Sequence, residues 1–163
     1  AIPAFVGQAL SGRPLTVAGD GSQTRSICYV DDTVRGILAM AFSHHAGPVN
    51  IGNPDELSML RLAEWIVELT GSSSEISFID LPVDDPKVRR PDTTRAEQLL
   101  DWRPTVPSEE GLRRTVAWFA EQLQAADTSA RAALGRKRAS VARMAPLLAV
   151  FDELSESARR WRR

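Results

Sequence analysis

The sequence predicts one domain of the mixed α/β class, an α+β-like fragment over 1–124, followed by a chemically different tail over 125–163. Short runs of strand-forming residues alternate with amphipathic helices along the first segment, which is typical of a mixed domain. No Gly-x-Gly-x-x-Gly or Gly-x-x-Gly-x-x-Gly run follows a strand anywhere in the 163 residues. The chain therefore lacks a turn that could hold a dinucleotide pyrophosphate at a helix N-terminus.

The first part of the domain is expected to form two helices and two short strands. Apolar residues over 4–10 indicate a first helix, with a glycine and a proline beyond its end. Strands are predicted over 15–17 and 27–30, and the Gly-Asp-Gly-Ser segment between them tolerates positive φ. Asp31 is a candidate N-cap for a second helix. The apolar residues of that helix repeat at helical spacing and predict one buried face, formed by Val34, Ile37, Leu38, Ala41 and Phe42.

A short apolar run over 49–52 predicts a further strand. Ser58 follows as an N-cap, and Leu57 and Leu62 stand at the two positions of a hydrophobic staple. Gly71 suits the position just beyond the end of this helix, because glycine adopts the left-handed conformation at little cost. We therefore expect a well-capped helix between Ser58 and Gly71.

The rest of the domain is expected to contain a strand over 76–79, an irregular charged loop over 82–91 and a short helix around Leu99. A turn with Trp102 follows, and Ser108 is the candidate N-cap of a last helix. One face of that helix carries Leu112, Val116, Phe119, Ala120 and Leu123.

The charge changes sign between the two segments. Residues 1–124 hold 11 basic and 17 acidic side chains, whereas residues 125–163 hold 9 basic and 4 acidic ones. The tail is rich in alanine and arginine, and an apolar stripe at helical spacing is interrupted by Pro146. We expect either a loosely packed helical appendage or disorder. The basic run 136–138 is interpreted as a solvated surface, so no nucleic-acid partner is predicted.

Several classes of protein are disfavoured by the composition. The apolar runs are shorter than the roughly 20 residues that cross a bilayer, so no membrane partner is expected. Cys28 is the only cysteine and is interpreted as a small core residue, which favours a reducing compartment and a cytoplasmic location. His44 and His45 are interpreted as a surface loop rather than a metal site. The chain begins without methionine, which indicates processing or an excerpt.

Basic and polar groups near strand ends and loops form the candidate site: Arg25, Asn50, Lys87, Arg89 and Arg90. Planar guanidinium groups match the oxygens of a diphosphate in bidentate fashion, so arginines converging from separate loops would suit such a ligand. Without further information, these arginines could also be solvated surface residues that bind no ligand. The pair Asp84 and Asp85 is interpreted as solvated or charge-balancing.

Six segments carry a resemblance to a known family: Pro14-Leu-Thr-Val, Gly19-Asp-Gly-Ser-Gln-Thr-Arg-Ser, Tyr29-Val-Asp-Asp, Gly47-Pro-Val-Asn-Ile-Gly-Asn-Pro, Asp84-Asp-Pro-Lys-Val-Arg-Arg-Pro-Asp and Asp101-Trp-Arg-Pro-Thr-Val-Pro-Ser-Glu-Glu-Gly-Leu. In order and spacing they resemble the C-terminal, substrate-binding part of extended short-chain dehydrogenases/reductases of Rossmann fold, the NAD-dependent epimerase/dehydratase family. Within that family the resemblance is strongest to UDP-glucuronate decarboxylases, which form UDP-xylose.

The resemblance implies a UDP-sugar as the substrate. It implies that Arg25 contacts the diphosphate, that Asn50 lies beside the nucleotide, and that Arg89 reaches the diphosphate or the ribose. It also places Thr16 and Val17 along the uracil base. Many relatives carry tyrosine where this chain has Ala18, so the packing around the base is expected to differ.

The family's chemistry is NAD-dependent oxidation at sugar C4, loss of the C5 carboxylate as carbon dioxide, and re-reduction. The resemblance assigns the glycine-rich turn, the catalytic Thr/Ser and Glu, and the Tyr-x-x-x-Lys pair to a preceding part of the enzyme. Tyr29 is the only tyrosine, and Thr33 stands four residues on. The chain alone is thus expected to bind no NAD, to have no catalytic residues and to be inactive.

Alternative functions are kept open. The same scaffold serves UDP- or dTDP-sugar 4-epimerases and 4,6-dehydratases, so the chain could be a part of one of these. It could also be a non-catalytic remnant or binding module. The expected protein partner is the missing N-terminal Rossmann half or a complementary chain, with a homodimer as a further alternative.

Overall fold

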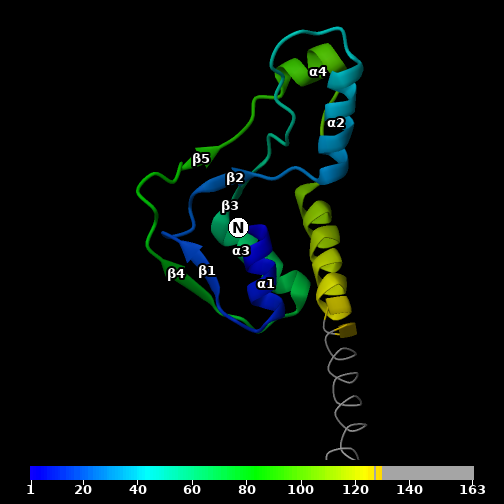
Figure 1. The fold of residues 1–163 in the computed structure, drawn as a ribbon. Coiled ribbons are helices and arrows are strands. Elements are labelled where there is room, and N and C mark those ends of the chain that lie inside the picture. The colour runs from blue at the N-terminus through cyan, green and yellow to red at the C-terminus, as the bar shows by residue number, and fades with distance from the viewer. Residues whose placement is uncertain (127, 130–163) are drawn as a thin grey trace, which may run out of the picture. The chain divides into compact units, whose positions relative to one another are not determined.

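The computed structural model describes residues 1–126 and 128–129 (Figure 1). The chain divides into two compact units, Ala1–Ala120 and Glu121–Arg163. The first unit is described below. The expected tail over 125–163 lies almost entirely outside the described residues, and its boundary at 124 stays a prediction. Within the described residues, no helix has the length and apolar character to cross a membrane.

The first unit contains helices and short strands in alternation, which confirms the predicted mixed class (Figure 1). A further helix begins at residue 108 and continues through 126. The other elements, in chain order, are α1 (Ile2–Leu10), β1 (Leu15–Ala18), β2 (Thr24–Ser26), α2 (Val30–Phe42), β3 (Glu56–Ser58), α3 (Met59–Thr70), β4 (Ile76–Ile79), β5 (Val88–Arg89) and α4 (Thr94–Leu100).

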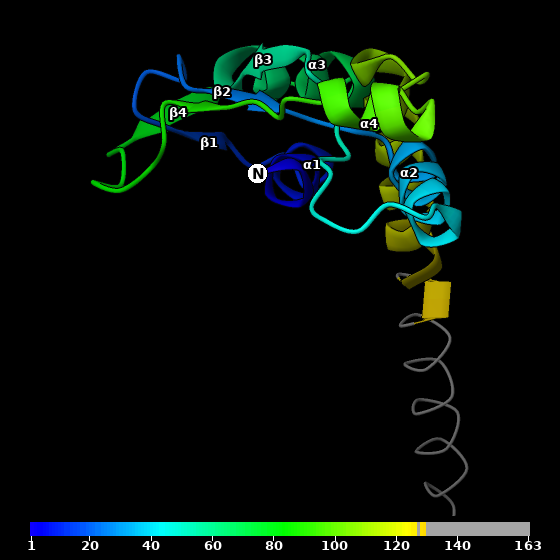
Figure 2. The same ribbon diagram turned by 90° about the horizontal axis from the view of Figure 1, so that it is seen from above.

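The strands form two small sheets (Figure 2). Strands β1 and β4 pair in parallel, with Leu15 opposite Ile76 and Ala18 opposite Ile79. In the second sheet β2 is central, antiparallel to β3 and parallel to β5. These two sheets bring the segment after α1 against segments that lie 30 to 64 residues later in the chain.

The best-predicted element is α3, because its end signals are local. The Ser58 hydroxyl accepts a hydrogen bond from the Arg61 backbone N–H at 3.1 Å, and Gly71 adopts φ +61° in the left-handed region. A serine cap of this kind stabilises a helix by about 1 kcal/mol. The helix predicted between Ser58 and Gly71 is therefore confirmed at both ends.

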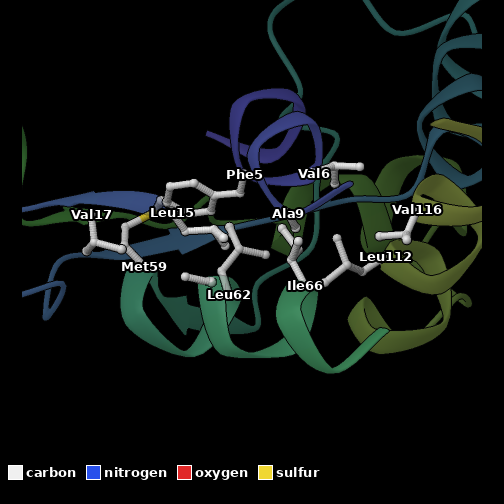
Figure 3. Packing of buried hydrophobic residues seen from close by; sticks show 11 residues of the cluster. Phe5, Val6, Ala9, Leu15, Val17, Met59, Leu62, Ile66, Leu112 and Val116 are labelled. Atoms are coloured by element: carbon white, nitrogen blue, oxygen red, sulfur yellow. The ribbon is translucent and has the colours of Figure 1, made fainter. Parts of the chain in front are cut away.

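The core lies where α1, α3, β1 and the 108–126 helix meet (Figure 3). Val6, Leu15, Val17 and Ile66 are fully enclosed. Leu112 and Val116 extend the same cluster from the last helix (Figure 3). Each such side chain contributes about 1.5–3 kcal/mol of transfer free energy, so residues 108–120 of the last helix are an integral part of this unit.

Two predicted strands are wrong. Residues 27–30 do not form a strand; the ladder lies over Thr24–Ser26 instead, where β3 and β5 supply hydrogen-bonding partners. Residues 49–52 have no strand geometry either. A strand needs a neighbouring backbone to accept and donate its hydrogen bonds. The loop predicted over 82–91 also contains the two-residue strand β5.

The predicted burial of the apolar face of α2 is also wrong. Val34, Ile37 and Leu38 are each about half exposed, and Phe42 is 84% exposed. The buried residues of this helix are Asp32 and Gly36. Asp31 is not the N-cap; the cap position is Tyr29 and Asp31 lies in the first turn. Sequence periodicity located the apolar face correctly but could not show what covers it.

Asp32 fixes α2 to the turn after α4. Its carboxylate accepts hydrogen bonds from the Thr105 N–H (2.9 Å), the Thr105 hydroxyl (2.9 Å), the Val106 N–H (2.8 Å) and Arg35. The Trp102 indole N–H donates to the Asp32 carbonyl at 3.0 Å. Burial would raise the pKa of the Asp32 carboxyl, but these donors, the Val106 N–H first among them, lower it to about 2.

Candidate functional site

A cavity of about 610 Å³ opens between the start of α1, strands β1 and β2, and the start of α3. Its wall is mostly apolar, with polar groups supplied by Thr16, Gln23, Arg25 and Asp85. Two of the predicted site residues, Thr16 and Arg25, therefore share one cavity. A large concave surface with a few convergent polar groups is the usual form of a small-molecule site.

Alternate residues of strand β1 face the cavity and the core. Thr16 and Ala18 line the cavity, whereas the Val17 side chain is fully buried in the hydrophobic cluster. Gln8 on α1 holds Thr16 twice: its amide donates to the Thr16 hydroxyl at 2.9 Å and accepts from the Thr16 N–H at 3.2 Å. Val17 can thus meet a ligand in this cavity only through its backbone.

The Arg25 guanidinium is held by three acceptors. Nη1 donates to the carbonyl oxygens of Thr24 (2.7 Å) and Pro86 (2.8 Å), and Nη2 donates to Asp85 Oδ1 at 2.6 Å. The two side chains of this ion pair are 20% and 27% exposed. The charge-balancing role expected for the Asp84–Asp85 pair is therefore met by Asp85, which balances Arg25.

The remaining basic candidates are placed by β5 and the residues beside it. Arg89 is the register partner of Arg25 across the parallel β2–β5 pair, and it is exposed. The Lys87 carbonyl accepts from the Thr24 N–H at 2.9 Å and so helps to anchor this strand. Arg90 lies 3.9 Å from a Glu56 carboxylate oxygen. The structure thus brings Arg25 and Arg89 side by side on neighbouring strands.

Asn50 does not join this cluster. Its side-chain amide donates to the Asp92 carbonyl at 3.0 Å, and the residue is exposed outside the lining of the cavity. Asn50 therefore ties the 47–52 segment to the residues before α4. A ligand that contacts both Asn50 and Arg25 would have to extend beyond the cavity.

Sequence reasoning missed Gln23 and the purpose of Gly21. Gln23 is 7% exposed, lines the cavity and donates through Nε2 to the Ala18 carbonyl at 2.9 Å. Gly21 has φ +75°, and a Cβ there would lie 2.9 Å from Val17 Cγ1 and 2.8 Å from Leu60 Cβ. The glycine is required both by the turn and by the close approach of α3. A buried glutamine gives no signal in a single sequence, because glutamine is usually exposed.

The structure also places the residues interpreted as having no catalytic or metal-binding role. His44 is exposed, and the His45 ring nitrogen lies 3.2 Å from the Arg95 guanidinium. Within residues 1–126 and 128–129, no group of three or more metal-ligating side chains gathers. The interpretation of Cys28 as a small core residue is wrong, because Cys28 is only partly buried and the strand predicted over 27–30 does not form.

Comparison with known proteins identifies relatives of this chain. Residues 1–52 match the NAD dependent epimerase/dehydratase family. UDP-glucuronic acid decarboxylase 1 of Xenopus tropicalis is 48% identical over 120 residues, which cover 74% of this chain and 28% of that protein. UDP-glucuronic acid decarboxylase 5 of Arabidopsis thaliana is 47% identical over 108 residues, 66% of this chain and 32% of that protein.

Solved structures give the same result for the fold. UDP-glucose 4-epimerase of Thermotoga maritima, solved with UDP-glucose, superposes with a TM-score of 0.72 at 31% identity, over 75% of this chain and 40% of that one. UDP-glucuronic acid 4-epimerase of Bacillus cereus, solved with UDP-glucuronic acid and NAD, gives 0.70 at 30% identity over the same shares. The chain spans less than a third of the length of the curated relatives named above. Sequence and backbone agree that it belongs to the NAD-dependent epimerase/dehydratase family, of which it carries a part.

Proposed function

We propose that this chain is the C-terminal, substrate-binding part of an NAD-dependent nucleotide-sugar enzyme, a UDP-glucuronate decarboxylase that forms UDP-xylose. The observation that carries the proposal is the cavity that joins Thr16 to Arg25, in a unit nearly half identical to proteins named UDP-glucuronic acid decarboxylases. An apolar wall suits the base, and a guanidinium at the rim suits a diphosphate.

Each candidate residue has a distinct task in this proposal. Thr16 and the backbone of Val17 lie along the uracil base, and Ala18 leaves space there. Arg25 binds the diphosphate, and Arg89, its neighbour in register, reaches the diphosphate or the ribose. Asn50 meets the nucleotide beyond the cavity. The candidate residues bind and orient the substrate, and no catalytic role is assigned to them.

NAD is assigned to residues outside this chain. The sequence has no glycine-rich strand-to-helix turn, and the Tyr-x-x-x-Lys pair is also absent. We therefore propose that turnover needs a second polypeptide segment. A cytoplasmic location stays a prediction from the single cysteine.

The second segment has a suitable place to dock. Val34, Ile37, Leu38 and Phe42 present an apolar face on α2 that is about half exposed or more. Soluble domains seldom leave such a face open. We propose that it packs against the N-terminal Rossmann half of the enzyme or against a complementary chain. A second copy of this chain would be the occupant if the protein forms a homodimer.

Ligand binding tests the proposal. UDP, dTDP and GDP would be titrated calorimetrically into this polypeptide and into any longer natural polypeptide that contains it. UDP should bind most tightly, and Arg25→Lys should weaken it about tenfold, because an ammonium cannot bind in bidentate fashion. Arg95→Lys, which changes an arginine of α4 in the same way, should leave affinity unchanged. Equal affinity for the three nucleotides, or equal effects of the two variants, would refute the proposed site.

A 4-epimerase is the second candidate, because the solved structures named above are a UDP-glucose 4-epimerase and a UDP-glucuronic acid 4-epimerase. The two activities are separated by products. UDP-glucuronate and NAD would be supplied to the reconstituted enzyme, and carbon dioxide release would be measured beside the ratio of C4 epimers. Decarboxylation supports the first proposal, and epimerisation without carbon dioxide supports the second. Carbon dioxide release by this chain alone would overturn the division of tasks.

A further inference from the structure

Arg25 is already paired with an anion from its own chain. A guanidinium has five N–H donors, and three are occupied here. Two of them, both on Nη1, meet backbone carbonyl oxygens of Thr24 and Pro86. The third meets the Asp85 carboxylate at 2.6 Å. The neutral carbonyls fix the plane of the guanidinium, whereas Asp85 is its charged partner.

The Asp85 carboxylate stands where an anionic ligand would bind. Both Arg25 and Asp85 line the cavity of about 610 Å³. Both side chains remain partly exposed, at 20% and 27%, so a ligand can reach the pair. Carboxylate and phosphate oxygens bind to guanidinium with the same geometry. A phosphate oxygen could therefore replace Asp85 Oδ1 while the carbonyl bonds keep Arg25 oriented.

Charge favours such a replacement over simple addition. The diphosphate of a nucleotide-sugar carries about two negative charges, and placing it beside the Asp85 carboxylate, a third negative charge, is unfavourable. With Asp85 moved away, Arg25 and its register partner Arg89 offer two positive charges. Asp85 lies in the charged segment between β4 and β5, next to Pro86, and this segment contains the fully exposed Val83.

We propose that Asp85 is an internal competitor for the diphosphate: it occupies Arg25 in the free protein and is displaced when the nucleotide-sugar binds. This inference rests on the proposed function, since it takes a diphosphate as the ligand of Arg25. Because a ligand must displace Asp85, it binds well only if its contacts with the two arginines outweigh the lost ion pair. A ligand with a single phosphate gains less from the two arginines, so it displaces Asp85 less well than a diphosphate does.

The test uses Asp85→Asn, with Asp84→Asn as a matched control. Both variants remove one negative charge from adjacent positions, but the Arg25 ion pair involves Asp85. UDP and UMP would be titrated calorimetrically into the wild-type chain and both variants. Asp85→Asn should bind UDP about fivefold more tightly, which is the worth of a partly exposed ion pair, and should narrow the preference for UDP over UMP. Asp84→Asn should change either affinity by less than about twofold.

If Asp85 only holds the loop in place, its removal weakens UDP binding or leaves it unchanged, and either result overturns the inference while the proposed function stands. An equal increase in UDP affinity in Asp85→Asn and Asp84→Asn would show a general charge effect and would also overturn the inference. Absence of UDP binding in wild type and in both variants would refute the proposed function itself. Asp85→Ser, measured with a thermal unfolding curve, provides the same comparison if the asparagine variant does not fold.

Discussion

Replacing Asp32 should destabilise the fold far more than replacing its neighbour Asp31. The Asp32 side chain is 2% exposed and accepts four hydrogen bonds, two of them from backbone N–H groups. Asp32→Ala would leave those donors without an acceptor inside the protein. Removing one partner from a buried charged cluster costs about 3–5 kcal/mol, and each unmet buried donor accounts for about 1–3 kcal/mol of such a loss.

Asp31→Ala is the matched control. Asp31 is exposed in the same first helical turn, so both variants lose a favourable interaction with the helix dipole and both gain helix propensity. We expect its free energy of unfolding to stay within about 0.5 kcal/mol of wild type. The difference between the two variants therefore isolates the buried hydrogen bonds.

Urea unfolding followed by tryptophan fluorescence measures the free energy of unfolding of both variants. Trp102 is a suitable probe because it is buried and donates its indole N–H to the Asp32 carbonyl. Curves at two protein concentrations separate unfolding from self-association through the open face of α2. A loss of 3–5 kcal/mol is a large share of the 5–15 kcal/mol typical of a domain. Free energies of unfolding for Asp32→Ala and Asp31→Ala that agree within about 0.5 kcal/mol would refute the reasoning.

Two further predictions concern the same junction. Folding lowers the pKa of Asp32 to about 2, so its ionised carboxylate contributes about 2 kcal/mol to the free energy of unfolding above about pH 4. This contribution is lost as the pH falls from about 4 towards 2. In acid unfolding, the difference in stability between wild type and Asp32→Asn should therefore disappear at low pH. Gly36→Ala should lower the free energy of unfolding by about 1–3 kcal/mol, because the new methyl group would overlap Ile51 and lie 2.9 Å from Trp102. Gly7→Ala on α1, where nothing lies within 4 Å, should be neutral or stabilising. Equal urea midpoints for the two variants would contradict the close packing at Gly36.

Elements with their signals in adjacent residues were predictable. The helix between Ser58 and Gly71 was located at both ends, because its cap and its left-handed glycine are chemical features of single residues. Strand β1 was located because its apolar residues alternate and a glycine-rich turn follows. Elements that depend on partners remote in the chain could not be located from the sequence. Strand β2 begins three residues before its expected start, because β3 and β5 provide its hydrogen-bonding partners at Thr24–Ser26.

The candidate site was predictable in part. A basic residue that suits a diphosphate can be recognised by type, which made Arg25 a candidate, and the structure places Arg25 and Thr16 in the same cavity. Their roles in ligand binding stay predictions. The partnership of Arg25 with Asp85 joins positions 60 residues apart and has no local signal. The same holds for Asp32, to which sequence reasoning assigned no separate role but whose carboxylate accepts hydrogen bonds from the Thr105 and Val106 N–H groups.

Because side chains alternate between the two faces of β1, successive positions in this strand are subject to different constraints on substitution. Leu15 and Val17 hold the core, while Thr16 and Ala18 face the cavity. Substitutions at the second pair can reshape what the cavity accepts without removing a contact from the core. Insertion or deletion of one residue between α1 and β1 would exchange the two sets and harm both. In this strand, ligand preference can drift at even-numbered positions while selection for folding acts on the odd-numbered ones.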